Sequence, residues 1–457
     1  MKILHYALGF PPYRSGGLTK FCVDLMVQQV NEKHIVGMLW PGQINFINKK
    51  VRIKKHSNVC IRECNIYSFE IINPLPISFD EGIINVSAFM LDTGLNSYAK
   101  FLDSYKPDVI HLHTLMGIHK SFLQAAKDRN IRLVFTAHDF FPICPKVTMF
   151  RHDSICNNVK SCLECGMCNT TALSFNKIRI LQSPLYRVLK DSLIVMKSRK
   201  HHRDKYLSGE ISDNFHKSVG SATDYKKLRW YYYSLLKQMD MIHYNSSVTK
   251  NVYETLFKLP NNCIINITHS NIKDNRVLKE FSGKKLRIRY LGPMSSAKGF
   301  FLLKNALDEL WSKQQNFCLD VHFVPNDKPP YMKSHAKYMY SDLKKIFDNT
   351  DVLIAPSIWY ETFGFTVLEA LSYGVPVIIS GSVGAKDILI NGAGIVVNNI
   401  SPKKLCKILQ ELTPEKLKVM NDIIIKKQTI MKIEEMSQQI ENICYGWNND
   451  KKIVLFN

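Results

Sequence analysis

The sequence predicts an α/β protein with two similar domains, each built on a parallel sheet. Apolar runs at residues 2–10 and 286–291 are each followed by a glycine-containing loop and a helix of apolar periodicity. Residues 351–380, DVLIAPSIWYETFGFTVLEALSYGVPVIIS, have the pattern of strand, loop, helix and strand, a unit that implies parallel strands. A chain of 457 residues is too long for one ordinary domain, so two domains are the natural expectation.

The first domain is expected to span residues 1–270. Its first strand, residues 2–10, leads into the loop PPYRSGG and a helix whose apolar period begins at Leu18. Residues 34–95 hold only short β-like segments and turns. Later strands, the last one of the domain included, are predicted at residues 108–113, 132–137 and 239–247.

A polar linker is predicted at residues 271–285, and a second domain at residues 286–429. The strand and helix patterns are interrupted there by glycine loops, as in the first domain. The predicted strands are residues 286–291, 319–324, 352–355 and 377–380, with another turn, helix start and strand within 381–397. The predicted helices are residues 335–350, residues 366–373 and one that begins at Phe300.

The composition is that of an ordinary globular protein, with 46% hydrophobic and 22% charged residues. No apolar run reaches the roughly eighteen residues that a membrane-spanning helix needs. The amino terminus, MKILHYALGFPPYR, does not have the pattern of a secretory signal. We therefore expect a soluble protein of the cytoplasm.

The net charge of +22 is partly concentrated at residues 177–237, which hold 14 Lys and Arg against 5 Asp and Glu. Within it, SLIVMKSRKHHRDK joins an apolar stretch to a basic cluster. Such a segment suits an anionic membrane surface, where each nearby basic side chain contributes about 1 kcal/mol. A solvated basic helix is the alternative. Nucleic acid is not expected as a partner, because the chain has no zinc-finger spacing, RNP-like motif or recognisable recognition helix.

Two carboxylates, Glu361 and Glu369, lie beside the start of the predicted helix at residues 366–373. A helix N-terminus attracts phosphate through its free N–H groups and its dipole. Glutamates next to an anion site suit a ligand with both phosphates and hydroxyls, such as a nucleotide sugar. The alternative is structural: Thr366 and Glu369 have capping-box spacing, and Glu361 would then be a solvated loop residue.

The pattern E-x7-E followed by A-x-x-x-G-V-P-V-I, residues 361–378, resembles the donor-binding signature of retaining glycosyltransferases of family 4. This resemblance implies the GT-B fold, in which two Rossmann-like domains face each other across a cleft. The helical segment from residue 430 to 457 would then return to the first domain. The implied activity is metal-independent transfer of a hexosyl or related group, with no cofactor, from a nucleotide-diphosphate sugar to a glycan acceptor. We expect a lipid-linked acceptor, in cell-surface polysaccharide synthesis at the inner membrane face.

The resemblance also implies roles for residues of the donor site. Glu361 would hydrogen-bond the sugar hydroxyls, and the backbone N–H groups of Gly364, Phe365 and Thr366 would hold sugar and phosphate. Glu369 would bind the hydroxyls of the nucleotide ribose.

Lys298, in the loop GPMSSAKG, would neutralise the leaving diphosphate together with the helix N-terminus. His138 ends a predicted strand, where open α/β sheets bind ligands, and would position the sugar from the opposite domain. Gly16 and Gly17 would lie near the diphosphate. Considered singly, the histidine could be structural and the lysine an ordinary surface residue.

The chain departs from the family pattern at Pro293, where an arginine is expected. Arg287 and Arg289, on the preceding strand, are candidate substitutes. The departure keeps open a non-catalytic partner subunit of the same fold, and a sugar-nucleotide epimerase is a further alternative.

Five of the 12 cysteines fall in one window, in a C-x2-C-x2-C run with two more before it. This density is typical of metal ligands, and a structural zinc or iron–sulfur cluster is a candidate. Reduced unbound thiols and disulfides remain the alternatives. Some members of the family that the chain resembles have a similar cysteine-rich insert after the His-Asp pair. The candidate ligands are Cys144, Cys156, Cys162, Cys165 and Cys168.

Overall fold

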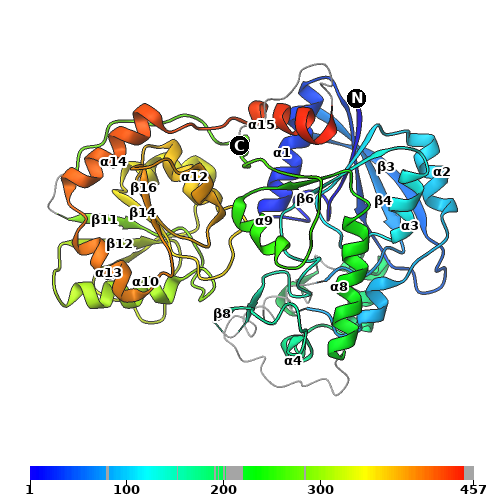
Figure 1. Cartoon of the computed structure of the whole chain (residues 1–457), viewed down its shortest axis with the longest axis horizontal. Coiled ribbons are helices and arrows are strands. Elements are labelled where there is room, and N and C mark those ends of the chain that lie inside the picture. The colour runs from blue at the N-terminus through cyan, green and yellow to red at the C-terminus, as the bar shows by residue number, and fades with distance from the viewer. Residues whose placement is uncertain are drawn as a thin grey trace.

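The computed structural model describes residues 1–78, 82–151, 153–189, 192–193, 195–198, 201, 220–281 and 285–446. It has two α/β lobes that lie side by side (Figure 1). The N-terminal lobe contains an eight-stranded sheet and the C-terminal lobe a six-stranded sheet.

The sheet of the N-terminal lobe has the order β10-β9-β6-β5-β1-β2-β4-β3. All neighbouring strands are parallel except β3, which pairs antiparallel with β4 at the edge. The strands are β1 (Lys2–Tyr6), β2 (Ile35–Pro41), β3 (Arg52–Ile61), β4 (Cys64–Ile72), β5 (Val109–Leu112), β6 (Arg132–Ala137), β9 (Met241–Tyr244) and β10 (Asn262–Ile264). A separate small hairpin pairs β7 (Phe150–Arg151) with β8 (Ser154–Ile155).

Helices connect these strands, as parallel pairing requires. They are α1 (Gly17–Asn31), the 3-10 helix η1 (Val86–Met90), α2 (Asn96–Tyr105), α3 (Lys120–Lys127), α4 (Cys165–Cys168), α5 (Phe175–Leu181), α6 (Pro184–Leu189), α8 (Ala222–Leu236) and α9 (Ser247–Glu254).

The sheet of the C-terminal lobe is fully parallel, with the order β13-β12-β11-β14-β15-β16. Numbered from its first strand, this is the 3-2-1-4-5-6 order of a doubly wound dinucleotide-binding fold. The strands are β11 (Leu286–Arg289), β12 (Phe317–Val321), β13 (Met332–Ser334), β14 (Val352–Ala355), β15 (Val377–Ser380) and β16 (Gly394–Val397). The helices are α10 (Phe300–Trp311), η2 (Tyr340–Asp342), α11 (Leu343–Asp348), α12 (Phe365–Ser372), η3 (Gly384–Ile388), α13 (Pro402–Gln410) and α14 (Pro414–Lys427).

After α14, the last described elements return to the N-terminal lobe. The helix α15 (Ile433–Gln439) packs against α1, and the π-helix η4 (Ile440–Tyr445) contacts β6 and β9. One buried apolar cluster contains residues of both lobes, among them Phe21 and Leu25 of α1 and Val367 of α12. The two lobes are therefore joined by packed apolar surface as well as by chain connections.

Two element predictions are wrong. Residues 335–350 were expected to form one helix, but only Leu343–Asp348 is α-helical, after a short strand and a 3-10 turn. The last strand of the N-terminal sheet is β10, not the segment at residues 239–247. With three residues, β10 is too short to give a clear periodic signal.

Candidate functional site

Most of the predicted site residues lie at the carboxyl ends of parallel strands. In the C-terminal sheet the strand order reverses between β11 and β14. Lys298 lies in the loop after β11, and Glu361 lies in the loop after β14. In the N-terminal sheet Gly16 follows β1 and His138 follows β6. Ligands of open α/β sheets bind at this edge and at this switch point, so the topology places these residues where a ligand is expected.

The loops of the two lobes touch each other at this edge. Thr362 donates a hydrogen bond from Oγ1 to the backbone oxygen of His138, at 3.2 Å. Its own carbonyl accepts from Ser246 Oγ of the N-terminal lobe, at 2.6 Å. A Cβ on Gly17 would lie 3.6 Å from the ring of Phe365. The glycine loop, the His138 loop and the start of α12 therefore form one surface.

Lys298 and Glu361 form an ion pair between the β11–α10 loop and the β14–α12 loop. Trp359 donates its indole N–H to the same carboxylate oxygen at 3.0 Å, and the Lys298 ammonium lies 4.8 Å from the indole centroid. Both charged side chains keep access to solvent, with 27% and 20% of their surface exposed. The structure thus places a cation and a carboxylate together at the strand edge.

Two helices begin at this surface without a side-chain cap. The N-cap of α1 is Gly16 and that of α12 is Gly364, with φ angles of 106° and 100°. A side chain at either glycine would strain the backbone, because this region of φ disfavours residues with a Cβ. The uncapped first turns leave backbone N–H groups for an anion.

The capping-box alternative for Glu369 is wrong. Helix α12 begins at Phe365, so Thr366 is inside the first turn rather than at the N-cap. The Glu369 carboxylate is buried and lies 3.4 Å from Nε2 of His269, which is buried just before the linker. Since His269 Nδ1 faces the backbone N–H of Asn271 at 3.3 Å, a neutral imidazole carries its proton on Nε2, towards Glu369.

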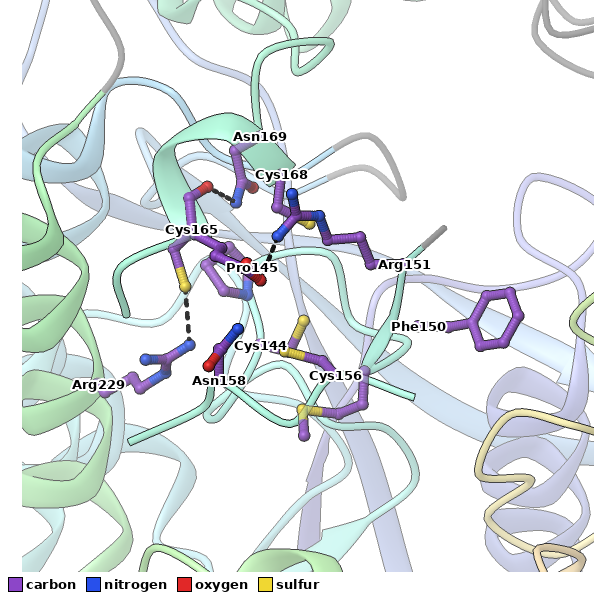
Figure 2. Close-up of a pocket in the computed structure, with 12 residues that line it drawn as sticks. Cys144, Pro145, Phe150, Arg151, Cys156, Asn158, Cys165, Cys168, Asn169 and Arg229 are labelled. Atoms are coloured by element: carbon purple, nitrogen blue, oxygen red, sulfur yellow. Dashed lines mark hydrogen bonds and ion pairs between the residues drawn. The ribbon is translucent and has the colours of Figure 1, made fainter. Parts of the chain in front are cut away.

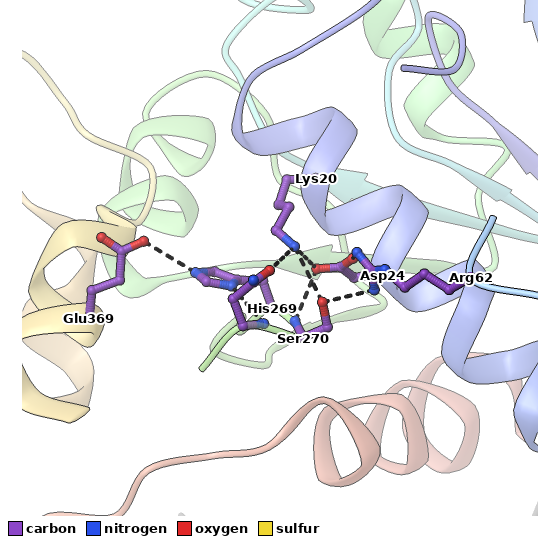
Figure 3. A network of polar contacts seen from close by, with 7 residues as sticks. Lys20, Asp24, Arg62, His269, Ser270 and Glu369 are labelled. Carbon is purple, nitrogen blue, oxygen red and sulfur yellow. Dashed lines mark hydrogen bonds and ion pairs between the residues drawn. The ribbon is translucent and has the colours of Figure 1, made fainter. Parts of the chain in front are cut away.

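Polar contacts continue from His269 into the N-terminal lobe (Figure 3). Ser270 donates its backbone N–H to Asp24 at 2.9 Å, and Lys20 bonds the same carboxylate at 2.6 Å. Arg62 bonds the other oxygen of Asp24 at 2.7 Å. This network sets helix α1 against the linker next to Glu369.

His138 is half-buried, and its ring packs against Phe21 with 4.7 Å between the centroids. Burial, with a smaller contribution from His243, lowers the pKa of His138 to about 3. The imidazole is therefore neutral at physiological pH. Asp139, which follows it, accepts a hydrogen bond from the backbone N–H of Phe141 and shapes the local turn.

The arginine candidates near Pro293 do not reach the site. Arg287 bonds Asp351 through its backbone N–H at 2.8 Å and its guanidinium at 2.5 Å. Arg289 is buried and bonds Thr350 at 3.2 Å. Both side chains are held within the C-terminal lobe, beside β11 and β14.

Arg14, in the glycine loop after β1, is a cation that the sequence pattern did not single out. It is half-buried, and burial alone lowers its pKa. No described residue forms a side-chain hydrogen bond or ion pair with it, in contrast to Arg287. In the sequence, Arg14 is recognisable only as a basic residue between Pro12 and Gly16 in the loop after the first strand.

The five cysteines do not form a zinc site in this arrangement. Cys144, Cys156, Cys165 and Cys168 line a cavity of about 20 Å³, together with Arg151 and Arg229 (Figure 2). Sulfur ligands of a tetrahedral zinc lie about 3.8 Å apart, as bonds of about 2.3 Å require. Among the described residues, however, no three of these thiols lie within 4.8 Å of one another.

A buried arginine occupies part of the cysteine cluster instead. Arg229 bonds the thiols of Cys162 and Cys165 and donates to the carbonyls of Ile143 and Val159, both at 2.5 Å. The hydrogen bond from Cys162 and the charge of Arg229 lower the pKa of Cys165. Arg229 therefore links Ile143, Val159, Cys162 and Cys165 in the cysteine-rich segment. None of the cysteines of the cluster is in a disulfide.

Much of the basic segment at residues 177–237, including the cluster KHHRDK, lies outside the described residues apart from His201. The described part exposes apolar side chains, among them Leu185 at 69% and Val188 at 79%. Arg187 lies between them in the sequence, and Arg179 lies on the preceding helix α5. In the described part of the chain, no helix has the length and apolar character to cross a membrane.

Residues 334–428 match the family model "Glycosyl transferases group 1". An uncharacterized 41.2 kDa protein in the cps region of Klebsiella pneumoniae is 28% identical over 145 residues, 31% of this chain. The chain spans only 39% of the length of that relative.

Solved structures match over nearly the whole chain. Sucrose-phosphate synthase of Thermosynechococcus elongatus is 11% identical with a TM-score of 0.56, covering 98% of this chain and 100% of the other. The lipopolysaccharide outer core galactosyltransferase WaaB, in its apo form, is 14% identical with a TM-score of 0.56 and the same coverage. At such identities these matches show the fold alone. The chain has the GT-B fold, and its C-terminal lobe contains a glycosyl transferases group 1 region.

Proposed function

We propose that this protein is a retaining glycosyltransferase that moves a sugar from a nucleotide-diphosphate sugar to a glycan acceptor. The observation that carries the proposal is the arrangement at one sheet edge. Four features lie there in chain order: Lys298, Glu361, the uncapped start of α12, and Glu369. The His138 loop of the other lobe contacts the same β14–α12 loop at Thr362. The matched family region covers Glu361 and Glu369.

The charges suit departure of a diphosphate. Breaking the bond between sugar and phosphate builds negative charge on the diphosphate and an oxocarbenium-like centre on the sugar. Lys298 and the N–H groups at the start of α12 would stabilise that negative charge. Arg14, from the glycine loop, would add the second cation that Pro293 does not provide. In this proposal these groups take the role that a metal ion has in other transferases.

The remaining groups would bind the two ends of the donor. Glu361, oriented by Trp359, would accept hydrogen bonds from sugar hydroxyls. Glu369 would accept from the ribose hydroxyls, with His269 beside it. His138 would contact the sugar from the opposite lobe, and attack of the acceptor on the face that the diphosphate leaves would retain the anomeric configuration.

The acceptor is proposed to be a lipid-linked glycan at the inner membrane face, in cell-surface polysaccharide synthesis. The exposed apolar side chains of α6, next to Arg179 and Arg187, fit an anionic bilayer surface. The relative from a cps region and the lipopolysaccharide transferase are consistent with this class of acceptor. The test is flotation with vesicles of anionic lipid, repeated at high salt. Absence of salt-sensitive association would contradict the membrane role.

The activity itself is tested with a panel of radiolabelled nucleotide sugars, with and without lipid-linked acceptors and a metal chelator. We expect transfer or slow hydrolysis of one donor, unaffected by the chelator and abolished in Glu361→Ala. Nucleotide binding without turnover of any donor would contradict the proposal. It would favour the non-catalytic partner subunit that the lack of an arginine at residue 293 suggests.

The role of Arg14 has a separate test. Calorimetric titration with nucleoside diphosphate should show about tenfold weaker binding in Arg14→Met, the effect of one lost cation–phosphate contact. Arg129→Met, which removes an arginine paired with Asp103 on the surface, is the matched control and should bind as the unmodified protein does. Equal affinity of the Arg14 variant would exclude the residue from the diphosphate site.

A further inference from the structure

Five histidines of the N-terminal lobe belong to one hydrogen-bonded chain. Four of them are buried: His5 on β1, His111 on β5, His113 directly after β5 and His243 on β9. His138 follows β6. Gln29 of α1, Thr136 of β6 and Tyr445 of η4 connect the imidazoles. The contacts, in order, are His138 Nε2 to His113 Nδ1 (3.2 Å), His113 Nε2 to His5 Nδ1 (2.9 Å), His5 Nε2 to Gln29 Oε1 (2.8 Å), Gln29 Nε2 to Tyr445 OH (3.1 Å), Tyr445 OH to His111 Nδ1 (2.7 Å), His111 Nε2 to Thr136 Oγ1 (2.6 Å), Thr136 Oγ1 to His243 Nδ1 (2.9 Å) and His243 Nε2 to the carbonyl of Ile265 (2.8 Å).

The carbonyl at the end of the chain determines the direction of these bonds. A carbonyl only accepts, so His243 carries its proton on Nε2 and accepts at Nδ1 from Thr136. The Thr136 oxygen then accepts from Nε2 of His111, which in turn accepts at Nδ1 from Tyr445.

The same rule continues from Tyr445 to His138. The Tyr445 oxygen accepts from the amide N–H of Gln29, whose oxygen accepts from His5 Nε2. His5 then accepts at Nδ1 from His113, and His113 accepts at Nδ1 from His138. Every imidazole is therefore the neutral Nε2–H form, and each contact between His138 and Ile265 joins one donor to one acceptor.

If every donor and acceptor between His138 and Thr136 were exchanged, and the Gln29 amide were flipped, each of these hydrogen bonds would still have one donor and one acceptor. This reversed direction would fail only at the end, because His243 Nε2 would then present a lone pair to the Ile265 carbonyl. Two buried acceptors would face each other without a proton, which is costly. Ile265 thus selects one of two directions for the whole chain.

Burial keeps these imidazoles neutral. Desolvation lowers the pKa of His5 and of His243 to about 4, and it also lowers the pKa values of His111 and His113. A protonated imidazole would have two donors and would break the order of the chain.

A metal ion is not the reason for the cluster. The facing nitrogens of His5, His111 and His113 lie within 4.8 Å of one another, which would suit a metal. Both nitrogens of each ring are already used in the hydrogen bonds above, so a metal would have to displace them.

We propose that this hydrogen-bonded chain of side chains fixes His138 in the Nε2–H form. Nδ1 of His138 then serves as a hydrogen-bond acceptor for a hydroxyl of the donor sugar. No described residue hydrogen-bonds Nδ1 of His138. Gln29, Thr136 and Tyr445 are then positioning residues, and the site prefers a sugar that offers a hydroxyl at this place over its deoxy analogue. The role at the sugar rests on the proposed function, whereas the form of the imidazole does not.

The form of His138 is measured by nitrogen NMR of the protein labelled with ¹⁵N-histidine, because protonated and unprotonated ring nitrogens differ widely in chemical shift. The His138 signals are assigned by their loss in His138→Gln. We expect Nε2 protonated and Nδ1 unprotonated in the ligand-free protein. The opposite form would overturn the proposal, whatever the activity.

Two variants interrupt the hydrogen-bonded chain of side chains that runs from His138 to the Ile265 carbonyl. Thr136→Val removes only a hydroxyl, and Thr136→Ser restores it; Tyr445→Phe removes the phenol. We expect Thr136→Val and Tyr445→Phe to show both forms of His138, and Thr136→Ser to show the Nε2–H form. Tyr225→Phe removes another buried phenol, bonded to the Ile83 carbonyl outside the chain, and controls for lost stability. An unchanged His138 signal in both interrupting variants would overturn the proposal.

Turnover of the donor separates this proposal from the proposed function. We expect kcat to fall about tenfold in Thr136→Val, the effect of one misdirected hydrogen bond, and to recover in Thr136→Ser. Titration with the donor should shift Nδ1 of His138, and its deoxy analogue should not. If the protein shows the Nε2–H form of His138 but binds no nucleotide sugar, the proposed function and the sugar contact are refuted. The role of the hydrogen-bonded chain in fixing His138 is not. Binding and turnover without a shift of Nδ1 would refute the sugar contact alone.

Discussion

Lys298 and Glu361 are paired with each other in the ligand-free protein, across the two loops at the switch point of the C-terminal sheet. Each residue was expected to contact a different part of the donor, the lysine its diphosphate and the carboxylate its sugar. Their pairing compensates both charges at the edge of the sheet.

Removing either charge of this pair should reduce activity far more than stability. We expect kcat/KM for the donor to fall at least about 100-fold in Lys298→Met or Glu361→Gln, the effect of losing one oriented charge at a reacting centre. The free energy of unfolding should change by no more than about 1 kcal/mol, because the pair is partly exposed. Steady-state kinetics and urea unfolding give the two quantities.

The matched control for this pair is Lys304→Met. Lys304 forms a partly exposed ion pair with Asp308 one turn along α10, away from the strand edge. Its removal should leave kcat/KM unchanged. A similar loss in both lysine variants would mean that Lys298 acts through stability or general charge rather than through the donor.

Glu369 is predicted to recognise the ribose of the nucleotide. In Glu369→Gln, binding of nucleoside diphosphate should weaken about tenfold, because a charged acceptor for two hydroxyls becomes neutral. The same variant should bind the 2′,3′-dideoxy nucleotide as the unmodified protein does. Calorimetric titration of the four combinations measures the coupling, and equal losses for both nucleotides would exclude a ribose contact.

The buried histidines predict that stability falls as the pH falls from 7 to 5. Their pKa values are lowered on folding, His5 and His243 to about 4 and His138 to about 3. Below about pH 6.5 the unfolded chain binds protons that the folded chain does not, so each histidine favours unfolding by about 2 kcal/mol at pH 5. Above pH 6.5 this effect vanishes.

Urea midpoints at pH 7, 6 and 5 measure this dependence. His243→Gln removes one of the titrating groups, so its stability should decrease less steeply with falling pH. His201→Gln replaces an exposed histidine and should keep the original slope. A stability that does not change between pH 7 and 5 would contradict the neutral, buried state of these imidazoles.

Gly384→Ala is predicted to separate the lobes. A Cβ at residue 384 would lie 2.2 Å from the Thr362 carbonyl and 2.5 Å from Ser246 Oγ, where the loop of one lobe meets the other. The contact must move, so the radius of gyration in solution scattering should increase and turnover should decrease. In Gly94→Ala nothing lies within 4 Å of the new methyl group, and both quantities should remain as they were.

The predicted elements that matched were those with strong local patterns. The buried strands β6, β14 and β15 were predicted with their observed bounds, because each is a short apolar run between turn residues. The edge strand β10 and the segment before α11 lack such runs. Strand β10 is held by its pairing with β9, and α11 forms where Leu343 and Phe347 pack into the core.

The candidate site was predictable where one motif sits on one element and unpredictable where contacts join distant elements. Glu361 and Glu369 stand out in the sequence, but His269 beside Glu369 does not, because a lone histidine just before a linker carries no pattern. His111 on β5 and His113 directly after it alternate in the sequence, which predicts only that they are buried. Their hydrogen-bond partners lie at residues 5, 136, 138 and 445, separations that no local pattern reports.

The position of Tyr445 bears on the order of synthesis. This residue is among the last of the described chain, yet it hydrogen-bonds His111 and Gln29 in the interior of the N-terminal lobe. A ribosome therefore makes the whole C-terminal lobe before the interior of the first one can be completed. Until η4 docks, His111 and Gln29 lack the Tyr445 hydroxyl as a hydrogen-bond partner.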